Sequence, residues 1–192
     1  MAAGGRRGEI LAAAREVFLE KGFEASTTRE IGAKAGVLKG SLYHYINSKD
    51  DLLFEVLAEI HRKGMGLLER MEADTDGSPA DRLARFVDSF VRHQVDNRLD
   101  AELFDREMRS LEPARRMEIA DRFEAHFRTL IEEGQREGVF DNALDPVAAS
   151  KGVFLMLNHL YVWYRPEGRL AVDDLAANYV RLVGNALGAA RG

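Results

Sequence analysis

The chain of 192 residues has no cysteine, only four prolines and no long uninterrupted apolar run. Without cysteine it can form neither disulfides nor thiolate metal sites, which favours a reducing compartment. Its longest apolar stretch, residues 153–164, is interrupted by Asn158 and His159 and is too short to span a bilayer. The start, MAAGGRRGEI, has no apolar segment after its arginines, so we expect no signal peptide. A cytoplasmic protein is therefore expected.

Sequence motifs of common enzyme classes are also absent. The chain has no Gly-x-Ser-x-Gly elbow, no phosphate-binding glycine loop and no His-Glu-x-x-His pair. Its five histidines are spread along the chain without the spacing of metal ligands. We therefore expect no catalytic residue, no metal and no cofactor. Two classes of function stay open on these grounds, namely a helical small-molecule-binding protein and an enzyme that uses other residues, both without DNA-binding activity.

Charge is distributed unevenly along the chain. The net charge is −5, but residues 1–50 hold eight Lys and Arg against six Asp and Glu, which gives +2. The remaining residues hold nineteen against twenty-six, which gives −7. A mildly basic front part joined to an acidic remainder is compatible with nucleic-acid binding through the front part.

Helical periodicity dominates the sequence, and no stretch alternates clearly enough to require a strand. We therefore predict an all-α fold. Helix starts are indicated by capping boxes at Thr27 with Glu30 and at Ser48 with Asp51. The pair Ser78-Pro79, with Asp81 three residues after the cap, and the pair Asp145-Pro146 indicate two more. The expected helices cover about 7–21, a short segment after Thr27, 39–45, 49–71, a segment from Pro79, 101–111, one long helix from Pro113 to Gly138, a segment from Pro146 through Trp163, and a last helix through Leu187.

The segment from Val153 to Trp163 is apolar on nearly every side of a helix. Such a helix must be shielded from water on every side. In a chain of this size we expect a second copy of the protein to shield one of those sides. We therefore expect a homodimer whose interface is formed by the last two helices.

The stretch from Thr27 to Tyr45 has the proportions of a helix-turn-helix. A first short helix ends at Gly36, and a second begins near Leu38 after a short turn. On this second helix Leu42 and Ile46 share the buried side. Away from that side of the helix lie Lys39, Tyr43 and His44. Gly40 permits another molecule to approach the backbone closely.

The segment TTREIGAKAGVLKGSLYHYINSKDDLLFEVL resembles the DNA-binding signature of the TetR family of bacterial transcriptional regulators. The resemblance covers residues 8–57 closely. It implies a three-helix DNA-binding domain, expected over 1–48, and a helical ligand-binding and dimerisation domain over 49–192. Two residues depart from the family pattern. Leu38 stands where a small polar residue is common, and Ile46 replaces a usual phenylalanine.

The resemblance also implies which residues contact an operator. Phosphates would be held at the start of the first short helix and by a basic residue that begins the next long helix. A lysine on the second short helix would reach a guanine edge, and a dimer would read a near-palindrome. The implied residues are Thr27, Thr28, Lys39, Gly40, Ser41, Tyr43, His44, Tyr45 and Lys49, with Arg6 and Arg7 as a flexible arm along the DNA.

Each of these assignments has a purely structural alternative. Thr27 and Ser48 are also typical helix caps, and a lysine such as Lys39 is solvated in most proteins. Tyr45 can instead pack inward beside the first helix.

Large aromatic and methionine side chains in the second part of the chain suit an adaptable apolar cavity. Each of them is alternatively a core residue, and a buried histidine is more often satisfied by its neighbours than bound to a ligand. The candidate pocket residues are Phe86, Phe90, His93, Phe104, Met108, Phe123, Phe127, His159 and Trp163.

The segment WYRPEGRL, residues 163–170, is similar to one in TetR-family members that respond to acyl-CoA thioesters of fatty-acid or steroid breakdown. This similarity implies a long apolar tunnel with Arg165 near its mouth, available to an anionic head group. The expected function is a homodimeric repressor that a small apolar or acyl-CoA-like effector releases from double-stranded operator DNA.

Overall fold

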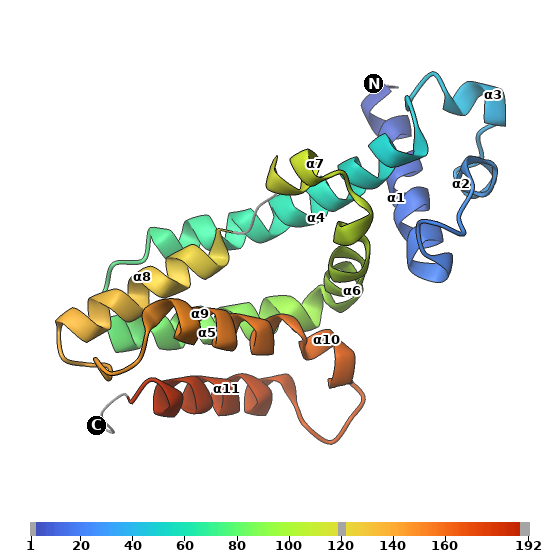
Figure 1. Ribbon diagram of the computed structural model, residues 1–192. Helices are drawn as coiled ribbons and strands as arrows, with labels where there is room; N and C mark the ends of the chain where they lie inside the picture. Colours follow the sequence, from blue (N-terminus) through green and yellow to red (C-terminus); the bar gives the residue numbers. More distant parts are fainter. Residues whose placement is uncertain (1–2, 119–121, 189–192) are drawn as a thin grey trace. The chain divides into compact units, whose positions relative to one another are not determined.

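The computed structural model describes residues 3–118 and 122–188, and every regular element in these ranges is helical, which confirms the all-α prediction (Figure 1). In this part of the chain no helix is long and apolar enough to cross a membrane. The elements are α1 (Ala3–Lys21), α2 (Thr28–Lys34), α3 (Lys39–Leu42), α4 (Lys49–Glu72), α5 (Pro79–Asp96), α6 (Arg98–Glu107), the 3₁₀ turn η1 (Met108–Ser110), α7 (Pro113–Glu118), α8 (Phe123–Arg136), α9 (Pro146–Asn158), α10 (Leu160–Trp163) and α11 (Val172–Ala186).

The chain packs as two compact units, each made of two segments. The first unit comprises residues 1–63 and 102–120, and the second comprises 64–101 and 121–192. Both α4 and α6 therefore pass from one unit to the other. The domain boundary expected after residue 48 stays a prediction, because these units are defined by packing and place the first half of α4 with α1–α3.

The first unit has a core of aliphatic residues and two aromatic rings. Leu42 and Ile46 are buried in it, as the periodicity predicted, and Phe18 is fully buried. The turn between α2 and α3 depends on two glycines. Gly36 has φ +65°, a left-handed conformation, and a Cβ on Gly32 would lie 3.0 Å from the Val37 carbonyl oxygen. These contacts hold the two short helices in a fixed arrangement.

In the second unit α5 packs against α8, α9, α10 and α11 (Figure 1). The side chains that it buries include Phe86, Val87 and Phe90, and α11 contributes Leu175 and Ala176. The start of α5 has the predicted capping box, with Ser78 Oγ accepting from Asp81 N at 3.2 Å and Pro79 in the first turn. Helix α9 likewise begins at Pro146 with an Asp145 cap.

The helix expected over 39–45 ends at Leu42, and two other expected helices are each divided in two. The single helix expected from Pro113 is divided into α7 and α8, with residues 119–121 outside the described part. Helix α7 belongs to the first unit and α8 to the second, so the two parts of the expected helix lie in different units. The expected helix through Trp163 is also divided, at His159, into α9 and α10.

Candidate nucleic-acid interface and effector cavity

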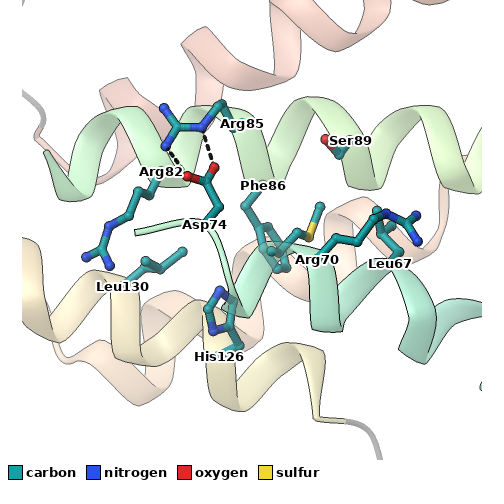
Figure 2. A pocket seen from close by; sticks show the side chains of 10 residues that line it. Leu67, Arg70, Asp74, Arg82, Arg85, Phe86, Ser89, His126 and Leu130 are labelled. Atoms are coloured by element: carbon teal, nitrogen blue, oxygen red, sulfur yellow. Dashed lines mark hydrogen bonds and ion pairs between the residues drawn. The ribbon is translucent and has the colours of Figure 1, made fainter. Parts of the chain in front are cut away.

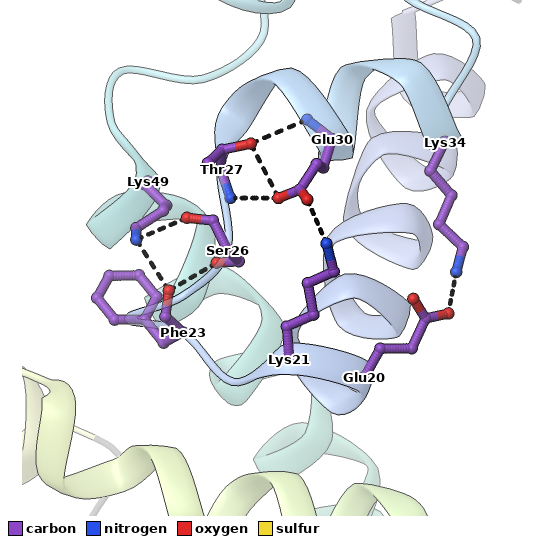
Figure 3. A network of polar contacts seen from close by, with 8 residues as sticks. All are labelled: Glu20, Lys21, Phe23, Ser26, Thr27, Glu30, Lys34 and Lys49. Carbon is purple, nitrogen blue, oxygen red and sulfur yellow. Dashed lines mark hydrogen bonds and ion pairs between the residues drawn. The ribbon is translucent and has the colours of Figure 1, made fainter.

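The N-terminus of α2 is closed by a complete capping box (Figure 3). Thr27 Oγ1 accepts from Glu30 N at 3.2 Å, and Glu30 Oε2 accepts from Thr27 N at 3.0 Å. An ion pair with Lys21, together with these bonds, lowers the pKa of the Glu30 carboxyl below its usual value. The role of Thr27 as a helix cap is therefore confirmed, and its hydroxyl already forms hydrogen bonds with Glu30. Thr28, the next residue, has its hydroxyl oxygen 3.4 Å from that of Tyr43.

Helix α3 packs on the core through its last residue, Leu42, and the turn that follows it begins with exposed side chains. Leu42 is fully buried, whereas Tyr43 is 50% exposed and His44 is exposed. Tyr45 is half-buried against the first unit's core, in line with the inward alternative. Gly40 and Ser41 lie in the helix, and the side chain of Lys39 is outside the described part. Leu38, at the N-cap of α3, is 82% exposed.

Lys49 holds the loop between α1 and α2 (Figure 3). Its ammonium donates to the carbonyl oxygens of Phe23 at 2.8 Å and Ser26 at 3.1 Å, and lies 4.2 Å from the centroid of the Phe23 ring. A phosphate contact by Lys49, as the resemblance implied, would have to share the ammonium with these carbonyls. In this structure Lys49 supports the loop that precedes α2.

Arg6 and Arg7 lie inside α1 instead of forming a flexible arm. Arg6 donates to the Gly36 carbonyl oxygen at 2.8 Å. Arg7 donates to the Tyr45 carbonyl oxygen at 3.0 Å and forms an ion pair with Glu55 at 2.5 Å. The two arginines therefore bond the turn between α2 and α3, and the segment after α3, to α1.

Arg106 and Glu107, at the C-terminal end of α6, were not singled out from the sequence. The Glu107 carboxylate is buried and accepts from Phe23 N at 3.1 Å and from Arg106 Nε at 2.8 Å. Arg106 also donates to the Phe18 carbonyl oxygen. This pair thus bonds α6 to the end of α1 and to the loop before α2. A buried carboxylate among charged neighbours leaves no periodic signal in the sequence.

Four of the candidate pocket aromatics, all in the second unit, form one packed cluster. Phe86 and Phe90 stack with ring centroids 5.8 Å apart, Phe127 lies 5.5 Å from Phe86, and Phe123 lies 5.2 Å from Phe90. None is more than 7% exposed. Geometries and distances of this kind are typical of packed core aromatics. His93 is half-buried and bonds Asn97, and burial lowers the pKa of its imidazole.

The other candidate pocket residues lie apart from this cluster. Phe104 and Met108 pack against the core of the first unit and therefore do not belong to the aromatic cluster of the second unit. His159 is exposed, with Nδ1 2.8 Å from the Leu155 carbonyl oxygen. Trp163 is 51% exposed. Arg165 is exposed and donates to the carbonyl oxygens of two preceding residues.

A cavity of about 170 Å³ lies in the second unit between the end of α4, the first half of α5 and α8 (Figure 2). Phe86 is the one residue of the sequence-based pocket that lines it. Its wall also carries three guanidinium groups and the imidazole of His126, whose pKa is lowered by burial. The lining residues are Leu67, Arg70, Met71, Asp74, Arg82, Arg85, Phe86, Ser89, His126 and Leu130.

Comparison with known proteins identifies the family. A family model described as bacterial regulatory proteins of the tetR family matches residues 10–56, and one described as the tetracyclin repressor-like C-terminal domain matches residues 76–187. The HTH-type transcriptional repressor KstR2 of Rhodococcus jostii (strain RHA1) is 30% identical over 183 residues, which cover 93% of this chain and 89% of that protein.

Solved structures show the same relationship. A bacterial regulatory protein in the tetR family from Rhodococcus RHA1 superposes with a TM-score of 0.86 and 32% identity, over 97% of this chain and 98% of that one. AibR, solved in complex with isovaleryl coenzyme A and operator DNA, superposes with a TM-score of 0.80 over 96% and 100% of the two chains. At 22% identity this second similarity shows the fold alone. The chain therefore belongs to the TetR family, and it is a ligand-responsive, DNA-binding transcriptional regulator and not an enzyme.

Proposed function

We propose that the protein is a homodimeric repressor that binds a near-palindromic operator and leaves it when a small apolar or acyl-CoA-like effector binds. The observation that carries the DNA contact is the contrast between the end of α3, which is buried, and the exposed turn that follows it. Leu42 is fully buried and fixes the helix, while Tyr43 and His44 are exposed on the side that would face a major groove. The relatives named as repressors support the direction of regulation. A regulator that binds chromosomal DNA works in the cytoplasm.

The residues that the family resemblance implies for DNA binding divide into two sets. Thr28 and Tyr43, with neighbouring hydroxyls on the exposed side, would bond phosphates, and Lys39 would reach a base edge. Lys49, Arg6 and Arg7 bond backbone carbonyls of the first unit. We propose that this second set acts mainly by holding α2 and α3 in the geometry that binding requires.

The first prediction concerns Lys39. Replacing Lys39 by alanine should weaken binding to the specific operator about tenfold or more, because a base-edge contact contributes about 1–3 kcal/mol. Gel-shift titrations with DNA upstream of the protein's own gene would measure this. Arg136→Ala, at an exposed arginine at the end of α8, is the control and should bind like the unmodified protein.

Salt dependence decides between this function and the alternatives without DNA binding. Affinity should fall steeply between about 50 and about 200 mM salt, since phosphate contacts release counterions. No shift with any upstream DNA at low salt would exclude the proposed repressor. Equal loss of binding in Lys39→Ala and Arg136→Ala would exclude the base contact.

Exposed apolar side chains on the last three helices support a homodimer. Leu155 of α9 is 60% exposed, Val162 and Trp163 of α10 are 53% and 51% exposed, and Leu182 of α11 is 50% exposed. Large apolar side chains that remain exposed on a folded chain are candidates for an interaction surface. A second copy covering them would position two α3 helices for the two halves of a near-palindrome, one helical turn or a multiple apart.

The second prediction uses Trp163, the single tryptophan of the chain, as a reporter of this interface. On dilution of the dimer its fluorescence should shift to longer wavelength as the half-exposed ring enters water. Leu182→Ala should raise the dissociation constant of the dimer about tenfold, the effect of about 1.4 kcal/mol. Analytical ultracentrifugation gives an independent value. A concentration-independent monomer would contradict the prediction.

The effector class is proposed from the WYRPEGRL segment and from the apolar core around Phe86. A ligand that binds only the folded protein raises its apparent thermal stability. A panel of acyl-CoA thioesters, steroids and cationic drugs should therefore contain compounds that raise the melting temperature and release the DNA in the same concentration range. Stabilisation without DNA release would identify a ligand that is not the effector.

A further inference from the structure

Leu38, the residue that precedes α3, is an apolar side chain that lies almost entirely in water. It is 82% exposed, and no other large apolar side chain in the described part of the chain is more than 60% exposed. Its neighbour Val37 is partly buried and packs on the core of the first unit. Two adjacent apolar residues thus have different surroundings, and packing on the core does not account for Leu38.

The position that Leu38 occupies is also unfavourable for a leucine. Leu38 is the N-cap of α3, with φ −63° and ψ 144°, and its side chain forms no cap hydrogen bond. Serine, threonine, asparagine and aspartate are preferred at N-caps, because their side-chain oxygens accept from the first free N–H groups of the helix. A single exposed leucine needs no explanation on most surfaces. One that replaces a cap, at the start of this helix, points to a contact outside the chain.

The start of α3 is open to another molecule. Gly40 is exposed, and a Cβ built on it would have no atom within 4 Å. The Leu38 carbonyl oxygen accepts from Ser41 N at 2.9 Å and from Leu42 N at 3.0 Å, so its backbone belongs to the first turn of the helix. Leu42 is fully buried and holds that turn on the core. A large surface can therefore approach Leu38 closely while its backbone stays in place.

We propose that Leu38 contacts the methyl group of a thymine in each half of the operator and is a specificity-determining residue. The inference rests on the proposed docking of α3 in a major groove, where the N-terminal residues of such a helix meet base edges. Leucine has no donor or acceptor in its side chain, so it bonds neither a phosphate nor a polar base edge. The thymine methyl is the apolar group that the major groove presents. Contact with the leucine removes apolar surface of both groups from water.

Operator DNA that carries uracil in place of thymine tests this contact, because uracil lacks only the methyl group. The DNA upstream of the protein's own gene would be amplified with either dTTP or dUTP, and gel-shift titrations would compare the two products. The ratio of the two affinities is the thymine preference. For the unmodified protein it should be about tenfold or more, since burial of one methyl group contributes roughly fourfold and a dimer meets two.

Variants assign this preference to Leu38. Leu38→Ala and Leu38→Ser should bind thymine DNA more weakly and lower the thymine preference about fivefold or more, because the apolar contact is lost. Leu99→Ala, at an exposed leucine of α6, is the matched control and should keep the full preference. The slope of affinity against salt should stay unchanged in the Leu38 variants, since they remove no phosphate contact.

Thermal stability separates this role from a structural one. Leu38→Ser supplies the missing cap acceptor, so it should raise the melting temperature while it weakens operator binding. A lower melting temperature together with an unchanged thymine preference would make Leu38 a structural residue and overturn the proposal. An equal preference in all variants would overturn the thymine contact alone, because the protein would still bind DNA. No shift of either DNA by the unmodified protein would overturn the repressor function and the thymine contact together.

Discussion

Replacing Glu107 by alanine should lower the free energy of unfolding of the first unit by about 2–4 kcal/mol, because it leaves the buried backbone N–H of Phe23 without its acceptor and removes one acceptor of the Arg106 guanidinium. The Glu107 carboxylate is 4% exposed and bonds Phe23 N at 3.1 Å and Arg106 Nε at 2.8 Å. Arg106 itself is partly exposed, so water compensates part of its loss. Glu107→Gln keeps an acceptor for Phe23 N and should cost roughly half as much.

Two spectroscopic signals distinguish the unfolding of the two units in this experiment. Trp163 lies in the second unit, so its fluorescence reports that unit, whereas far-ultraviolet circular dichroism reports all helices. If the units unfold separately in urea, Glu107→Ala should move the dichroism transition to lower urea and leave the fluorescence transition in place. If they unfold together, both transitions move.

The control is Glu102→Ala. Glu102 is on the same helix, and its ion pair with Arg106 is 3.9 Å long and partly exposed, so its loss should cost less than about 1 kcal/mol. Equal destabilisation by the two variants would contradict the role of Glu107. At temperatures where Glu107→Ala remains folded, it should also weaken operator binding, because the loop before α2 is less firmly held and the binding-competent state is less populated.

The sequence predicted the local elements of this fold well because their signals are local. Caps such as Thr27 and Ser78, followed three residues later by an acidic residue, define helix starts, and both form the expected boxes. The buried positions Leu42 and Ile46 followed from helical spacing. Family membership followed from the segment around α2 and α3, whose motif is specific.

What the sequence could not predict are partners distant along the chain. Lys49 is basic and lies where a phosphate clamp was expected, yet its ammonium bonds carbonyl oxygens 23 and 26 residues earlier. Phe104 and Phe123 look alike in sequence but pack in different cores. The cavity wall is formed by arginines whose spacing is typical of a solvated helix face. The arginines form one charged wall only after folding has brought α4, α5 and α8 together.

A substitution of Gly134 is the other change for which we expect a large loss of stability. Gly134 lies in α8, where alanine usually stabilises a helix by about 1 kcal/mol. Here a Cβ would lie 2.1 Å from Cδ2 and 2.3 Å from Cε2 of Phe140, a ring that is 4% exposed. The ring has little freedom to withdraw, since Phe140 N also bonds the Gly134 carbonyl oxygen at 3.1 Å. Gly134→Ala should therefore destabilise the second unit by about 3 kcal/mol, the upper part of the range for overpacking.

A double-mutant cycle with Phe140→Ala tests this mechanism. Phe140→Ala alone should cost about 3–5 kcal/mol, as expected for removal of a buried aromatic ring. In that background the clash is gone, so Gly134→Ala should become stabilising by about 1 kcal/mol, and its effect changes sign. Gly66→Ala in α4 is the matched control, because its nearest neighbour would be the flexible Arg70 guanidinium at 3.9 Å. If Gly134→Ala had the same effect in both backgrounds, the contact with Phe140 would not be what requires glycine at this position.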